Sequence, residues 1–167
     1  MIKRLCVLVI AAAALRLTGL LPFQTTDVAR LKPVEALVIS VEQGEIVFRG
    51  EECQGRGTTW EEAWTDLEQS AEGTVFLDTA EQVVLVGQAA DLLAGAAWSE
   101  QLRPAANVCI CIGEAPEPEA AAAYLSAHAG GLTLQKVRAA LLRQETVKPP
   151  VLVKTEGGLR LYGAYDR

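Results

Sequence analysis

Residues 55–67 read GRGTTWEEAWTDL, so two glycines lead directly into a strongly patterned helix. Apolar side chains recur there at the spacing of one helix face, and they are Trp60, Ala63, Trp64 and Leu67. The acidic residues between them fall mostly off that face and suit the positive end of the helix dipole. We expect this helix to anchor the core of the protein.

Two threonines stand where this helix should begin. Thr58 lies three residues before Glu61, and Thr59 lies three residues before Glu62. Either pair has the spacing of a capping box, in which the hydroxyl and the carboxylate accept hydrogen bonds from amides at the helix end. The sequence therefore predicts a turn and an N-cap over Gly55–Thr59.

The order of the other patterns predicts the fold class. Apolar, β-branched runs read as strands, and they cover 35–41, 45–49, 74–78, 82–87, 108–112, 151–154 and 159–165. Further helical patterns cover 89–101, 114–125 and 132–142, the last with an apolar set of Leu134, Val137, Leu141 and Leu142. This order predicts an α/β (α+β) fold, a mixed β-sheet packed by helices. The run 82–87 is apolar on both faces, so we expect it at the centre of the sheet.

Composition narrows the range of functions. A length of 167 residues with 50% hydrophobic residues suits one domain. The net charge is -6, and no cluster of lysine and arginine follows the apolar N-terminus, so a nucleic-acid partner is not expected. His128 is the only histidine, which leaves almost no material for histidine-based metal sites or catalytic relays.

The N-terminus has the order of an export signal. Lys3 and Arg4 precede an apolar run over residues 5–15. A cleaved signal peptide, a retained membrane anchor and an N-terminal helix of a soluble protein are the three alternatives, and the basic-then-apolar order favours the first two. We assign a signal peptide or membrane anchor to 1–23, a linker to 24–33 and the mixed α/β domain to 34–167.

Three patterns resemble chemical sites, and each has a simpler structural explanation. The Gly55–Thr59 turn could bind an anion at a helix start, but it lacks the Lys-Ser/Thr of a P-loop, which favours a structural turn. Cys109 and Cys111 do not have zinc-ligand spacing. The adjacent acids Glu51-Glu52 and Glu61-Glu62 should point apart. We therefore expect no catalytic, cofactor-binding or metal-binding residues; the alternative is a small-ligand-binding or enzymatic envelope protein that uses the Gly55–Thr59 turn.

The cysteines leave one question open at this stage. Cys53 could form a disulfide with Cys109 or Cys111 in an oxidising compartment. The other interpretation is that these residues are small buried hydrophobes, which the burial preference of cysteine favours.

Four features of the chain together resemble a known family. The N-terminal segment ends in Leu17-Thr18-Gly19, and the strand 36–41 is followed by a hairpin partner. The lead Gly55-Arg56-Gly57-Thr58-Thr59 enters a helix, and the strand Val83–Gly87 follows it. Pro150 and the strand 159–164 close the chain. In this combination the sequence resembles the N-terminal domain of the Ger(x)C family, the C subunit of spore germinant receptors.

The resemblance implies a non-enzymatic protein that acts in spore germination by protein–protein contact, without a cofactor. It implies membrane-embedded receptor subunits as partners, attachment to the membrane through the N-terminal segment, and a place on the extracytoplasmic side of the spore inner membrane. Leu20 stands where the family carries its lipidated cysteine, so lipid attachment is not expected. Because the family continues into further domains, we expect a truncated, single-domain relative.

Overall fold

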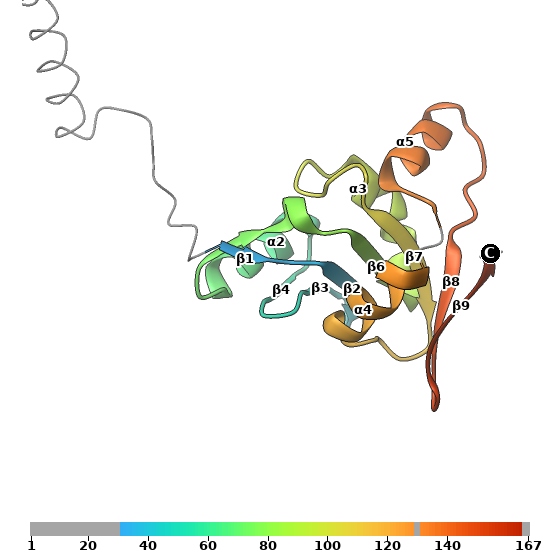
Figure 1. The fold of residues 1–167 in the computed structure, drawn as a ribbon. Coiled ribbons are helices and arrows are strands. Elements are labelled where there is room, and N and C mark those ends of the chain that lie inside the picture. Colours follow the sequence, from blue (N-terminus) through green and yellow to red (C-terminus); the bar gives the residue numbers. More distant parts are fainter. Residues whose placement is uncertain (1–30, 129–130, 165–167) are drawn as a thin grey trace, which may run out of the picture. The chain divides into compact units, whose positions relative to one another are not determined.

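A seven-stranded mixed sheet forms the centre of the protein, in the order β4-β3-β2-β6-β7-β8-β9 (Figure 1). The computed structural model describes residues 31–128 and 131–164, which belong to a compact unit that begins at Leu31. The expected signal peptide or anchor, 1–23, lies outside the described residues. The strands of the sheet are β2 (Ala36–Glu42), β3 (Glu45–Arg49), β4 (Gln54–Gly57), β6 (Gln82–Val86), β7 (Asn107–Ile112), β8 (Pro150–Thr155) and β9 (Gly158–Ala164).

The sheet has a parallel centre and antiparallel sides. Strands β2, β6, β7 and β8 are parallel to their neighbours within this group. Strands β3 and β4 extend it on one side, and β9 extends it on the other. All five residues of β6 are buried, because helices cover both faces there. The expected mixed sheet and the central position of the 82–87 run are thus confirmed.

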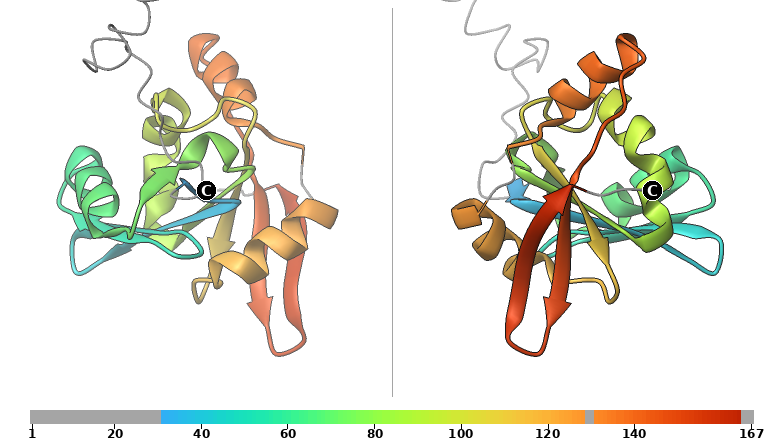
Figure 2. Two further views of the ribbon diagram at one scale, coloured as in Figure 1. Left: turned by 60° about the vertical axis from the view of Figure 1, so that its left-hand side comes forward. Right: turned by 90° about the vertical axis from the view of Figure 1, so that its right-hand side faces the viewer.

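Helices cover the two faces unequally (Figure 2). One face packs against α2 (Trp60–Ser70), α3 (Leu93–Trp98), α5 (Leu134–Leu142) and the 3₁₀-helix η3 (Gly87–Leu92). The other face packs against α4 (Pro118–His128) alone among the described helices, mainly over β2, β6 and β9. Each face therefore has its own apolar cluster, which we call the α2-side core and the α4-side core. In the described part of the chain, the helices are too short or too polar to cross a membrane.

The expected anchor helix is present, but only two of the four residues of its apolar face are fully buried. Ala63 and Leu67 are completely buried, whereas Trp60 and Trp64 pack at the margin of the α2-side core. The backbone of α2 at Ala63 comes closest to the sheet, against Gly55 and Gly57, and this close approach leaves the larger Trp60 and Trp64 rings only partly buried. The helix does anchor this core, through its smaller residues.

Two expected hairpins frame the sheet. Strands β2 and β3 join through Gln43 and Gly44, whose φ angles of 54° and 87° suit a two-residue turn. Strands β8 and β9 join through residues 156–157 and continue beyond the paired end of β7 (Figure 2). Both connections place strands adjacent in sequence side by side.

Several local expectations were wrong. Gln54–Gly57 form the edge strand β4 rather than a turn. The 89–101 helix is instead η3 followed by the short α3. In α5, Leu134 and Val137 are buried, but Leu141 and Leu142 are exposed. This helix packs on α3, and its buried residues both lie in its first half, so its last turn is left exposed among the described residues.

A second, two-stranded sheet closes one end of the unit. Here β1 (Leu31–Pro33), taken from the expected linker, pairs in parallel with β5 (Thr74–Phe76). The 3₁₀-helix η2 (Leu77–Thr79) follows β5, and the Thr79 hydroxyl accepts a hydrogen bond from the Val34 amide. This pairing fixes the chain just before β2.

Helix side chains satisfy backbone groups at both edges of the large sheet. At β4, the Asp66 carboxylate accepts the Arg56 amide at 2.8 Å, and the Ser70 hydroxyl donates to the Gln54 carbonyl at 2.5 Å. At β9, the Leu161 amide donates to the Tyr124 hydroxyl at 2.9 Å. Such contacts protect strand edges from pairing with other chains.

Candidate functional site

The Gly55–Thr59 segment is built for close packing. A Cβ on Gly55 would lie 2.3 Å from the Ala63 carbonyl oxygen, and one on Gly57 would lie 2.3 Å from the Ala63 nitrogen. Real Cβ atoms do not approach backbone atoms this closely, so only glycine lets β4 lie against α2. These glycines serve the strand–helix contact.

The amides of this segment already have carboxylate partners. Thr59 is the N-cap of α2, and its hydroxyl accepts the Glu62 amide at 3.2 Å. The Glu62 carboxylate accepts from the amide of Thr58 at 2.9 Å and from its hydroxyl at 2.5 Å. These bonds, led by the Thr58 hydroxyl, lower the pKa of Glu62. With Asp66 on the Arg56 amide, an anion would have to displace two carboxylates, so the geometry does not favour an anion site here.

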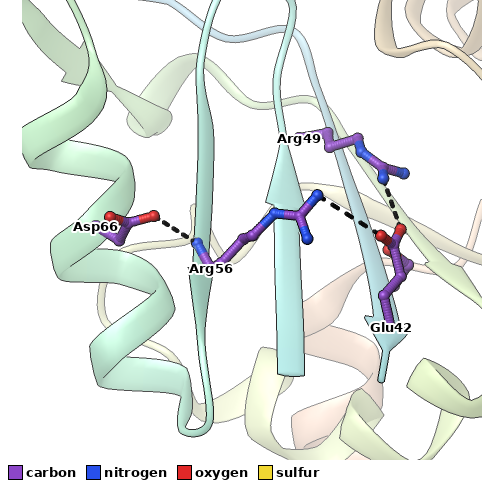
Figure 3. A network of polar contacts seen from close by, with 5 residues as sticks. Glu42, Arg49, Arg56 and Asp66 are labelled. Atoms are coloured by element: carbon purple, nitrogen blue, oxygen red, sulfur yellow. Dashed lines mark hydrogen bonds and ion pairs between the residues drawn. The ribbon is translucent and has the colours of Figure 1, made fainter. Parts of the chain in front are cut away.

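A charge-paired network lies on the α4-side face of β2, β3 and β4 (Figure 3). Arg49 and Arg56 both approach Glu42, at 2.6 Å and 3.8 Å. The Ser40 hydroxyl also donates to Glu42, and this bond, followed by the charge of Arg49, lowers the pKa of Glu42. Because these cations and the carboxylate already pair with one another, we interpret the network as structural: it joins the side chains of neighbouring strands on this face of the sheet.

The cysteines lie on opposite sides of the sheet. Cys53 belongs to the α2-side core, whereas Cys109 and Cys111 belong to the α4-side core. No disulfide joins Cys53 to either of them. Burial, with a smaller effect of Cys111, raises the pKa of Cys109 to about 12, and burial also raises the pKa of Cys111. Protonated thiols are poor nucleophiles and poor metal ligands, so the buried-hydrophobe interpretation fits both residues.

The remaining sequence candidates have structural partners. The His128 ring stacks on Tyr124 with centroids 4.4 Å apart, and its Nδ1 lies 2.9 Å from the Tyr124 carbonyl oxygen. Glu51 accepts the amides of Glu35 and Ala36 at the start of β2. In the described ranges, no three histidine, cysteine or acidic residues gather as a metal site.

The most distinctive surface feature is a pocket of about 340 Å³ between the start of α2 and the end of α3, which we call the tryptophan pocket. Its lining comprises Trp60 and Glu61 from α2, with Gly95, Trp98, Ser99, Glu100 and Gln101 from α3 and the loop after it. The pocket brings together the first residues of α2 and the last residues of α3, which are far apart in sequence. Sequence reasoning did not identify it.

The two tryptophans of this pocket are held differently. Trp60 meets Phe48 edge-on with ring centroids 4.8 Å apart, which fixes it against the sheet. Trp98 is 49% exposed, and the guanidinium of Arg138 lies 5.0 Å from its ring centroid. Arg138 is itself held, because its Nε donates to the Ala97 carbonyl at 2.8 Å. The pocket thus has one fixed aromatic wall and one aromatic wall that faces solvent.

Three polar groups of the tryptophan pocket, those of Trp60, Glu61 and Glu100, have no partner within the described fold. The Trp60 indole N–H is buried and has no acceptor among residues 31–128 and 131–164. Glu61 and Glu100 are exposed, and neither carboxylate has a hydrogen bond or ion pair within these same ranges. Phenylalanine at position 60 would pack without an unpaired donor, so internal packing alone does not explain the tryptophan.

A second groove, of about 320 Å³, lies between α4 and the β8–β9 hairpin. It is lined by Tyr124, Leu159 and Lys154, among others. Lys154 pairs with Glu114 at 2.8 Å, and this hydrogen bond raises the pKa of Lys154. Since its cation is already paired, this groove offers fewer unused groups than the tryptophan pocket.

The sequence carried only a weak signal for the tryptophan pocket. Trp98 follows Ala96 and Ala97, and in a helix those two alanines and the tryptophan cannot all face the core. The exposed tryptophan could have been suspected, but its proximity to Trp60 depends on the tertiary fold. Comparisons of the chain with protein-family models, curated proteins and solved structures found no match.

Proposed function

We propose that this protein acts in spore germination as a non-enzymatic, exported or membrane-anchored domain that binds the membrane-embedded subunits of a germinant receptor. The proposal places it on the extracytoplasmic side of the spore inner membrane. Its basis is the resemblance of the sequence motifs to the Ger(x)C family, above all the Gly-x-Gly-x-Thr lead into α2.

The observation that best supports action by protein contact is the tryptophan pocket. The pocket joins the half-exposed Trp98 to two carboxylates that have no partner within residues 31–128 and 131–164, and tryptophan is enriched among the energetically important residues of protein interfaces. By contrast, the groups considered as catalysts cap amides, stack on a neighbouring ring or lie buried as neutral thiols.

The alternative, a ligand-binding or enzymatic protein that uses the Gly55–Thr59 segment, has less support. A ligand there would need backbone amides as donors, and Asp66 and Glu62 already accept those of Arg56 and Thr58. No other observation on this segment favours a bound ligand.

Fractionation of the native host with a tagged copy of the 167-residue protein tests the proposal. We expect the protein in the membrane fraction of spores, co-purifying with integral-membrane receptor subunits, and slower germination when its gene is deleted. Recovery in the cytosol without membrane partners, together with normal germination of the deletion strain, would overturn it.

A further inference from the structure

We infer that the tryptophan pocket binds a basic segment of a protein partner, with a lysine or arginine side chain lying against Trp98 between Glu61 and Glu100. This inference rests on the proposed function and deepens it, since it names the chemistry that the partner must present. Charge, aromatic surface and space each support it.

Charge comes first. The pocket lining contains two exposed carboxylates and no basic side chain. The acidic surface continues along the outer face of α2, where Glu62, Asp66 and Gln69 line an adjoining shallow groove that shares Glu61 with the pocket. A partner segment crossing both would meet negative charge along its path, and this favours a basic segment over an acidic or neutral one.

The aromatic surface already carries one cation. Arg138 places its guanidinium over the Trp98 ring within the fold, which demonstrates that this ring accepts a cation in the geometry of a cation–π contact. Nearly half of the Trp98 surface remains exposed beside that contact. The carboxylates of Glu61 and Glu100 offset the repulsion that Arg138 would exert on a second cation.

Space is provided by Gly95. This residue lies in the middle of α3, one turn before Trp98, and a Cβ placed on it would meet no atom within 4 Å. Its backbone conformation does not require glycine, because its φ is not positive. Glycine in a helix interior costs stability relative to alanine, so its presence here suits a pocket that must stay open.

The test uses the 167-residue protein and a synthetic acetylated, amidated (Lys-Ala)₅ peptide, with (Arg-Ala)₅ as a second probe and (Glu-Ala)₅ as the control. Binding is followed by tryptophan fluorescence and by calorimetry. We expect both basic peptides to bind, (Glu-Ala)₅ not to bind, and the affinity to fall with added salt because exposed charges are screened.

Matched variants separate the pocket from general attraction to an acidic protein. Glu61→Lys and Glu119→Lys change the net charge equally, but Glu119 is exposed on α4, on the opposite face of the sheet. We expect Glu61→Lys to weaken binding about fivefold or more, the scale of one lost surface ion pair, and Glu119→Lys to change it less than about twofold. Equal effects of the two reversals would overturn the inference.

A variant that leaves charge unchanged gives an independent readout. Gly95→Phe fills the pocket, and Gly95→Ala adds only a methyl group in the same place. We expect Gly95→Phe to abolish measurable peptide binding while circular dichroism and thermal unfolding remain those of a folded protein. Peptide binding that survives Gly95→Phe and Trp98→Ala would show that the basic segment binds elsewhere.

Two further outcomes are distinguishable. If native receptor subunits are captured equally by the wild-type protein and by Glu61→Lys, the proposed function stands and the pocket inference fails. If basic peptides bind through the pocket but no membrane protein is captured, the pocket stands and the germination proposal fails. Concentration-dependent dimerisation that Gly95→Phe abolishes would identify a second copy as the occupant and overturn the basic-partner inference.

Discussion

Replacing Gly55 should do severe damage, since this glycine allows β4 to lie against α2. Changing Gly55 to alanine places a Cβ 2.3 Å from the Ala63 carbonyl oxygen and 2.4 Å from the Leu67 nitrogen. Because both contacts are backbone atoms, α2 must move away, and we expect a loss of about 3 kcal/mol or failure to fold. Urea unfolding measures this.

The control for this substitution is Gly95→Ala, which adds the same methyl group in open space. It should stabilise the protein by about 0.5–1 kcal/mol, the usual gain from replacing an interior helix glycine. If both alanine variants unfold at the wild-type urea concentration, the close approach of β4 and α2 is not as described.

The raised pKa of Cys109 should make the free energy of unfolding depend on pH in the alkaline range. Its pKa is about 12 in the fold and near 9.0 when unfolded, so between these values the folded state holds a proton that the unfolded state loses. Stability should therefore fall above pH 9, by about 1.4 kcal/mol per pH unit from this group. In Cys109→Val this contribution disappears. The free energy of unfolding, measured by denaturant titration at pH 8, 9 and 10, should therefore fall less steeply with pH than in the wild type. An unchanged dependence of the free energy of unfolding on pH would assign the loss of stability at alkaline pH to other groups.

At the scale of elements, the cap of α2 distinguishes a structural role from ligand binding at the Gly55–Thr59 segment. Thr59→Ala removes the hydroxyl that accepts the Glu62 amide, and we expect a loss of about 1 kcal/mol in thermal or urea unfolding. Arg56→Ala removes an ion pair with Glu42 at 3.8 Å and the contacts of the guanidinium with the Gln54 side-chain amide, all near the surface, and should cost less than about 0.5 kcal/mol. A stable Thr59→Ala protein would argue that the threonine serves something other than the helix.

The edge strand β9 allows a second test at this scale. Tyr124→Phe removes one hydroxyl and leaves the Leu161 amide without its acceptor, while the ring can still stack on His128. We expect a loss of about 1 kcal/mol and faster hydrogen exchange at Leu161. Protection of that amide in Tyr124→Phe equal to the wild type would show that water or another group replaces the phenol.

The sequence patterns predicted elements whose burial follows from their own periodicity. The α2 stripe, the β2–β3 and β8–β9 hairpins and the fully apolar β6 are of this kind. Patterns failed where burial depends on a distant partner. Gln54–Gly57 have no β-propensity of their own and become a strand only because β3 and α2 hold them. Leu142 fits the apolar set of α5 but is 71% exposed, because little of the described chain covers the last turn of this helix.

The same limit explains why the tryptophan pocket could not be read from the sequence. Trp60 and Trp98 belong to separate helices, and they line one pocket only because α2 and α3 cover the same face of the sheet. No local pattern encodes that proximity. The N-cap of α2 at Thr59, in contrast, follows from the sequence, because capping is a local interaction.

At the scale of the whole molecule, the sheet separates two apolar cores and places the thiols on both sides of it. Cys53 lies in the α2-side core, and Cys109 and Cys111 lie in the α4-side core, so no small movement can bring Cys53 within bonding distance of either. The stability of the unit should therefore not depend on the redox potential of its compartment, whichever side of a membrane it occupies.

We expect the same unfolding midpoint with and without dithiothreitol, and no cross-linked peptide containing Cys53 with Cys109 or Cys111 after oxidation of the folded protein. All three residues are buried, so iodoacetamide should label them only when the unit opens. Because the two cores share the strands between them, opening should expose both together, and mass spectrometry should find Cys53 and Cys109 labelled at similar rates. Labelling of Cys53 many times faster than Cys109 would show that the α2-side core opens alone, and that the sheet does not couple the two cores.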